Sequence, residues 1–276
     1  MSRIAGFLRE LFATPLQILC AVLLTVVLVL VAVPGLVAPQ SPYAIDVARA
    51  LQPPSAAHWF GTDDVGRDLF SRVVHGTRIT LGLVAGALLA SAVVGGFLGL
   101  VAGYYGRAAD LVFGRFVDMI LTFPPVIAGV VITGVLGPGA RNLILALAVV
   151  YIPMFFRIAR SGALAERQRT YVEAARALGF GEASIMLRQV LPNVLPLVLL
   201  QYVILFPLAL QIEAALGFLG LGVAPPTPDW GAILEQGKNF IFSAWWMSLW
   251  PGLFLLGAAF AVMVLGRTLQ QRFDRR

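Results

Sequence analysis

The sequence predicts an all-α membrane protein with six transmembrane helices. Of its 276 residues, 59% are hydrophobic and 12% are charged, whereas about a quarter of the residues of an ordinary soluble domain are charged. The hydrophobic residues form long blocks separated by short polar segments, and about 20 apolar residues are enough to cross a bilayer as a helix. The six candidate spans are residues 16–37, 79–105, 116–136, 142–156, 194–216 and 245–266.

The first and fourth spans are the least typical of the six. Residues 16–37 follow Arg3 and Arg9, as a signal peptide would, but the apolar core is longer than that of a signal peptide, so we expect an uncleaved signal anchor. Residues 142–156 are short for a span. The flanking Arg141 and Arg157 can extend their charged ends to the membrane surface and lengthen it.

The distribution of basic residues predicts the orientation. Six spans place both termini on one side, and basic residues concentrate in cytoplasmic segments. With cytoplasmic termini, 14 of the 20 basic residues lie inside, namely Arg3, Arg9, Arg107, Arg115, Arg157, Arg160, Arg167, Arg169, Arg176, Arg188, Arg267, Arg272, Arg275 and Arg276. The net charge of +6 therefore reflects topology, and we expect lipid rather than nucleic acid as the surrounding partner.

These spans divide the chain into consecutive regions. We expect a cytoplasmic N-terminus, a first transmembrane helix, a periplasmic segment, a core of five helices that contains a cytoplasmic loop at 157–193, and a cytoplasmic tail. Their bounds are 1–15, 16–37, 38–76, 77–267 and 268–276. In the second span, Gly95, Gly99 and Gly103 recur every four residues, a spacing that predicts close helix packing.

The inside loop carries the most informative motif. Residues 173–179 read Glu-Ala-Ala-Arg-Ala-Leu-Gly, and Leu191-Pro192 follows. Residues 160–178 and 182–190 favour helix, and Gly179 and Gly181 break it. The loop therefore predicts a helix, a turn and a second helix, either seated in a groove of a partner protein or lying on the inner leaflet.

This motif resembles the Glu-Ala-Ala (EAA) loop of ABC importer permeases. The matching residues are Glu173, Ala174, Ala175, Leu178, Gly179, Leu191 and Pro192. The chain departs from the pattern at Gln189, where the family commonly has isoleucine. The resemblance implies that these residues dock into the ATPase subunit and couple ATP hydrolysis to transport.

Two further segments resemble the dipeptide, oligopeptide and nickel permeases of that family. The first precedes the second span and contains Gly61, Thr62, Asp63, Gly66, Arg67, Asp68, Ser71 and Arg72. The second, at 216–231, reads Leu-Gly-Phe-Leu-Gly-Leu-Gly, then Pro225-Pro226 and Asp229-Trp230-Gly231. Together with the EAA loop, the likeness covers most of residues 61–267.

The family implies a type I ABC importer permease fold and a set of partners. These are a second permease subunit, two cytoplasmic ATPases that hold ATP and Mg, and a periplasmic or lipid-anchored binding protein. The mechanism would be alternating access, and the cargo peptides, nickel or metal chelates. The sequence agrees that the ATPase is another chain: its single lysine, Lys238, precedes Asn239, so no phosphate-binding P-loop motif is present. We expect no enzymatic site, cofactor or metal in this chain.

Charged residues within the spans are candidates for the translocation path, because a carboxylate at mid-helix costs about 2.5–3.5 kcal/mol to insert. Glu213 lies deep in the fifth span beside Gln211, and either a path or gating role or a structural hydrogen bond is open to it. Asp118 is expected to pair with Arg115. Phe123 and Pro124 interrupt the third span, and a kink there would line the path or simply bend the helix.

Few other residues suggest chemistry. His58 and His75 are too far apart for a metal-ligand motif and are expected on the surface or at an interface. Cys20 is the only cysteine. The alternative function is a secondary transporter driven by an ion gradient, which should show inverted repeats and paired carboxylates.

Overall fold

The computed structural model describes residues 14–274, and the fold is helical almost throughout. Within this range no strand forms, and one isolated bridge joins Thr62 and Asp68. The all-α prediction is therefore confirmed. The predicted cytoplasmic N-terminus, 1–15, lies almost wholly outside the described residues.

The helices follow in chain order, with three short turns of 3₁₀ or π helix among them. They are α2 (Pro15–Ala32), α3 (Pro34–Val37), η1 (Val47–Arg49), α4 (Leu69–Tyr105), α5 (Arg107–Leu121), α6 (Pro125–Leu136), α7 (Ala140–Glu166), α8 (Thr170–Ala177), α9 (Glu182–Ile185), η2 (Met186–Val190), α10 (Leu191–Phe218), α11 (Trp230–Gly237), η3 (Lys238–Phe240) and α12 (Trp246–Asp274).

Five helical stretches are long and apolar enough to cross a membrane, and the third predicted span differs from the others. The five are α2, α4, α7, the run from α9 through α10, and α12. In place of a straight helix over 116–136, α5 and α6 meet at an angle of 90°. Pro124 and Pro125 follow Thr122 there, and a proline cannot continue the helical hydrogen-bond ladder, so the helix ends and restarts in another direction.

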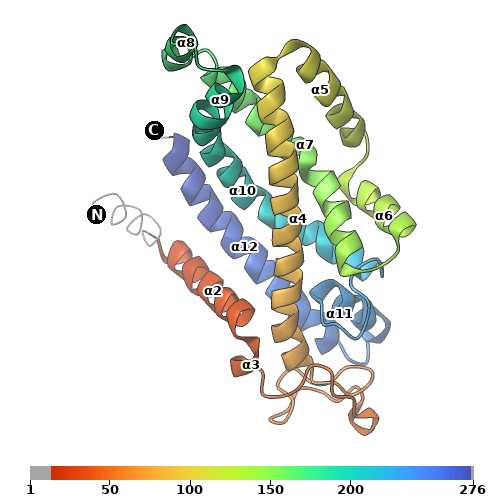
Figure 1. Cartoon of the computed structure of the whole chain (residues 1–276). Helices are drawn as coiled ribbons and strands as arrows, with labels where there is room; N and C mark the ends of the chain where they lie inside the picture. Colours follow the sequence, from red (N-terminus) through yellow and green to blue (C-terminus); the bar gives the residue numbers. More distant parts are fainter. Residues whose placement is uncertain (1–13, 275–276) are drawn as a thin grey trace.

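The long helices pack around α4, which runs through the centre of the bundle (Figure 1). Helices α7, α10 and α12 lie beside it, and α2 packs against α12 and α4 at one flank. Helices α8 and α9 lie at one end of the bundle, which we call the α8 end (Figure 1). Residues 38–68 and α11 lie at the other, which we call the α11 end.

Several helices differ in extent from the predicted spans: α7 continues to residue 166 where the prediction ended at 156, and α12 continues to residue 274 where it ended at 266. Helix α4 begins at Leu69, ten positions before the predicted start at residue 79, because the Asp68 carboxylate caps it by accepting a hydrogen bond from Ser71 N (2.8 Å). The first span divides into α2 and α3, because Pro34 follows Val33 and begins a new helix.

The interface between α4 and α7 is the largest between two helices, and the predicted glycine spacing creates it. A Cβ atom added to Gly99 would lie 3.0 Å from Ala159 Cβ, and one added to Gly103 would lie 2.8 Å from Ala163 Cβ. The Ser91 hydroxyl donates across the same interface to Ala148 O (2.8 Å). Small residues let two helix backbones approach closely in lipid, where apolar association alone has little driving force.

We predict that Gly99→Val destabilises the fold, whereas Gly82→Val does not. A side chain at position 99 overlaps the α7 backbone, and overpacking of this kind costs about 1–3 kcal/mol. A Cβ at Gly82, on the same helix, meets no atom within 4 Å. Thermal unfolding of the two variants in detergent micelles checks this, and equal midpoints would contradict the close α4–α7 contact.

Candidate functional site

The loop between α7 and α10 forms a compact helical turn at the α8 end. The predicted helix over 160–178 is wrong in one respect, because α7 ends at Glu166 and α8 begins at Thr170. Arg167 lies in the break, and its Nη1 atom donates to the carbonyl of Tyr104 (3.2 Å). The last carbonyl groups of a helix lack intrahelical partners, so Arg167 satisfies the end of α4 rather than continuing α7.

The predicted turn at Gly179 is confirmed. Gly179 has φ +81, a left-handed conformation that residues other than glycine adopt at a cost, whereas Gly181 has φ −67. The second predicted helix, 182–190, is longer than expected. It continues through a π-helical turn at Met186–Val190 into α10, so that Glu182–Phe218 is one apolar helix of 37 residues.

Glu182 fixes α8 against the bundle. Its carboxylate accepts hydrogen bonds from Arg176 Nε (2.9 Å) and from the Tyr104 hydroxyl. The bond with Glu182, followed by the one with Tyr104, raises the pKa of Arg176 above its ordinary value. Helix α8 is therefore held to α9 and to the end of α4 by charged hydrogen bonds, which are stronger than neutral ones.

The motif residues of this loop divide into an outward and an inward set. Leu178 is 77% exposed, and Phe180 beside it is 53% exposed. Ala175 is 4% exposed and packs inward with Val172, so it does not belong to the outer face that the sequence suggested for it. Leu191 is half-buried; the residues of the motif that are exposed are Glu173, Ala174, Leu178, Gly179 and Pro192.

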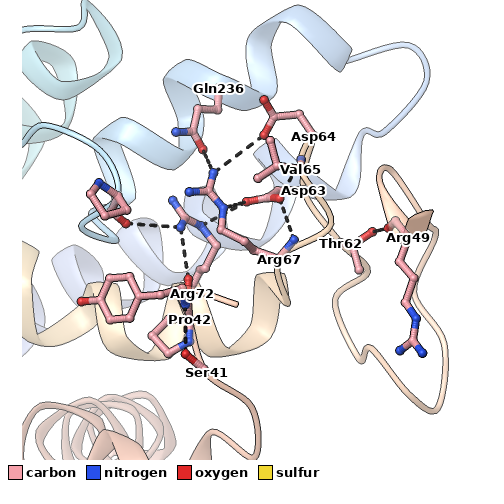
Figure 2. Close-up of polar contacts among 12 residues, drawn as sticks. Ser41, Pro42, Arg49, Thr62, Asp63, Asp64, Val65, Arg67, Arg72 and Gln236 are labelled. Atoms are coloured by element: carbon pink, nitrogen blue, oxygen red, sulfur yellow. Dashed lines mark hydrogen bonds and ion pairs between the residues drawn. The ribbon is translucent and has the colours of Figure 1, made fainter. Parts of the chain in front are cut away.

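At the α11 end, the eight signature residues from Gly61 to Arg72 are all buried, and Asp63, Arg67 and Arg72 among them form a polar cluster (Figure 2). Asp63 is its centre. One carboxylate oxygen accepts from the backbone of Arg67 (2.8 Å), and the other faces the guanidinium groups of Arg67 (2.6 Å) and Arg72 (3.4 Å). Arg67 also reaches Gln236 of α11 (3.4 Å).

Arg72 ties three segments of this end together. Its side chain is 1% exposed, and Nη1 donates to the carbonyls of Pro42 (3.3 Å) and Pro226 (3.5 Å) (Figure 2). A buried charge is tolerated where it is paired and hydrogen-bonded, and Arg72 meets both conditions through Asp63 and these carbonyls. The two family-like segments, far apart in the chain, thus form one structure.

His58 belongs to the same cluster. It is 5% exposed and its Nδ1 lies 2.9 Å from Asp68 Oδ1, so of the two expected positions, surface or interface, the surface one is wrong. The indole N–H of Trp230, which is fully buried, donates to Val73 O of α4 (3.0 Å). His58 and Trp230 bind side chains and backbone of the α4 start, contacts that the sequence pattern alone did not indicate.

The structure separates the candidate path residues. Glu213 is fully buried, whereas Gln211 on the same helix is exposed. Pro124 is exposed, and Phe123 lines an apolar cavity of about 320 Å³ at the bend between α5 and α6. The cavity is not lined by Glu213, so these residues do not form one site.

Asp118 has a different partner from the one expected. Its Oδ1 atom lies 3.6 Å from Arg157 Nη2 of α7, and both side chains are more than half exposed. The partner predicted for it, Arg115, is on the same helix and forms no such pair. A deeper pair, Asp110 with Arg160, also connects α5 to α7.

Residues 95–276 match the family described as binding-protein-dependent transport system inner membrane component, which is well over half of the chain. The chain belongs to this family. It is a permease subunit of an ABC importer and a multi-pass protein of the inner membrane, and the alternative of a secondary transporter is not favoured.

Curated relatives extend the similarity to the N-terminal part. The dipeptide transport system permease of Alkalihalophilus pseudofirmus is 39% identical over 82% of this chain and 75% of its own length. The probable D,D-dipeptide transport system permease of Escherichia coli is 37% identical over 95% and 88%. The glutathione transport system permease of Pectobacterium atrosepticum is 34% identical over 83% and 76%.

We predict that the polar cluster at the α11 end stabilises the fold. Arg72→Met should lower the free energy of unfolding by about 1–3 kcal/mol, because it removes one of the two cations of Asp63 and the donor of the Pro42 and Pro226 carbonyls. Arg78→Met, an exposed position on the same helix, should change it little. Chemical or thermal unfolding of the purified variants in micelles measures both. A stable Arg72→Met permease would show that the cluster contributes little to the fold.

Proposed function

We propose that this chain forms one half of the translocation path of an ATP-driven importer for peptides or peptide-like solutes. The observation that carries the proposal is the exposed loop at the α8 end, whose outer face combines apolar Leu178 and Phe180 with charged Glu173. The other half of the path belongs to a second permease subunit, and this chain supplies no ATPase site of its own.

The α8 end is the proposed docking site of the ATPase. A helix that presents exposed apolar residues in a rigid frame fits a hydrophobic groove of a partner protein. The hydrogen bonds of Glu182 to Arg176 and Tyr104 make this frame stiff, so a displacement of α8 is passed to α4 and to the long helix that begins at Glu182. Alternating access would follow from movement of these helices, driven by ATP and Mg bound to the partner.

The same assignment fixes the proposed orientation. The α8 end faces the cytoplasm, with both termini, and the α11 end faces the periplasm, because the arginines concentrate at the α8 side. A periplasmic or lipid-anchored binding protein would dock at the α11 end, over residues 38–68 and α11. Relatives named for dipeptide, D,D-dipeptide and glutathione transport support a peptide cargo, and none of those named here points to nickel or a metal chelate.

We predict that Gly179→Val abolishes peptide-stimulated ATP hydrolysis and uptake in the assembled importer, whereas Gly181→Val leaves both close to wild type. Neither glycine has an atom within 4 Å of an added Cβ, but only Gly179 has a positive φ. Valine at 179 strains the turn that presents α8, while valine at 181 does not. If both variants insert in the membrane and have equal activities, the turn at Gly179 is not required for coupling.

Topology can be tested by thiol labelling. In a Cys20→Ser background, single cysteines at the exposed Ser55 and Asn239 should react with an impermeant reagent added to spheroplasts, and one at the exposed Ala183 should not. Permeabilised cells are the control, since all three should then react. Labelling at 183 in intact spheroplasts would reverse the proposed orientation.

A further inference from the structure

Two carboxyl groups lie buried together where α10 meets α11. Glu213 of α10 and Asp229, which precedes α11, are both fully buried, and Asp229 Oδ2 would lie 3.2 Å from a Cβ on Gly217, one helical turn beyond Glu213. Glycines allow the approach: a Cβ on Gly217 would lie 2.8 Å from Gly231 Cα, and one on Gly231 would lie 3.0 Å from Ala214 O. The backbones of α10 and α11 are therefore nearly in contact beside the two acids.

The two acids have unequal hydrogen bonding. Asp229 Oδ1 accepts from the Thr80 hydroxyl of α4 (2.6 Å), and Oδ2 accepts from Ala232 N (3.2 Å). Neither carboxyl oxygen of Glu213 has a hydrogen-bond partner in this structure. Within residues 14–274, no arginine, lysine or histidine forms a salt bridge or hydrogen bond with Glu213.

Two ionised carboxylates side by side in a buried site are unfavourable in free energy. Adjacent like charges without a cation repel strongly in a buried environment, and the usual outcome is that one of the two keeps a proton. Hydrogen bonds to the ionised form favour ionisation, and Asp229 receives two of them while Glu213 receives none. The proton therefore belongs to Glu213.

We propose that Glu213 is a neutral carboxylic acid whose proton is directed at the neighbouring Asp229 carboxylate, and that this couples α10 to the α11 segment. Thr80 completes the joint, because its hydroxyl donates to Asp229 and accepts from Trp230 N (3.0 Å). Three segments, α4, α10 and the start of α11, then meet at Asp229. Glu213 acts here as a positioning residue that holds the α11 segment against α10, and not as a ligand for cargo.

The proton can be observed without any transport assay. In infrared spectra of the full-length purified chain near neutral pH, Glu213 should give a C=O stretching band of a protonated carboxyl group that shifts in D₂O. The band should disappear in Glu213→Gln and remain in Glu235→Gln, a partly exposed glutamate of α11 paired with Lys238. Carboxyl-¹³C glutamate should shift the band in the wild-type protein, so the result does not depend on a variant's folding.

A wild-type spectrum without such a band, or with one that glutamate labelling leaves in place, would overturn the proposal. The second readout is uptake by the assembled importer, and only this part rests on the proposed function. A glutamine amide at position 213 can donate to Asp229 and an alanine cannot, so uptake by Glu213→Gln should exceed that by Glu213→Ala at least about tenfold, the effect of one hydrogen bond to a charged group.

Equal loss of uptake in both inserted variants would mean that a charge at position 213 is required, which also overturns the proposal. If the wild-type importer moved no peptide at all, the proposed function would fail, and the infrared band would still decide the protonation of Glu213.

Discussion

The close contact of α4 with α7 is the constraint on which the rest of the bundle depends. Gly95, Gly99 and Gly103 remove side chains from one stripe of α4, and the α7 backbone occupies the space. Once these two helices are fixed, α10 packs against both, and α5 is tied to α7 by the Asp110–Arg160 pair. Arg167 and Tyr104 then connect the end of this helix pair to the α8 loop.

The charged clusters at the two ends of the bundle differ in how deeply they are buried. At the α11 end, charged groups are largely withdrawn from solvent: Asp63 pairs with Arg67 and Arg72, and Asp64 lies 3.8 Å from Arg67. At the α8 end, Arg176 and Glu182 remain half-exposed. Burial of the first cluster makes it a rigid part of the fold, while exposure of the second leaves the surface of α8 open for contact with another protein.

The sequence was sufficient where the physics is local. Apolar block length located five spans, and Gly179 marked a turn that glycine alone makes without strain. It failed where the outcome depends on distant residues. The start of α4 was missed because Arg72 and His75 read as polar loop, yet the loop that folds over Arg72 buries it.

The same limit applies to the candidate site. The sequence motif does not distinguish Ala174 from Ala175, but in the structure Ala175 packs inward with Val172. Asp118 pairs across to α7 and not along its own helix, a choice set by the bend before Pro125. The relation of Glu213 to Asp229 follows from the contact of Gly217 with Gly231, which no local pattern contains.

The continuity of the helix from Glu182 to Phe218 has a mechanical consequence. At 1.5 Å per residue its 37 residues extend about 55 Å, so it reaches from one face of the membrane to the other. A tilt of about 5° around its midpoint moves each end by about 2.4 Å, and the two ends move in opposite directions. Such a helix behaves as a lever with its pivot in the bilayer: an inward push at one face is an outward swing at the other.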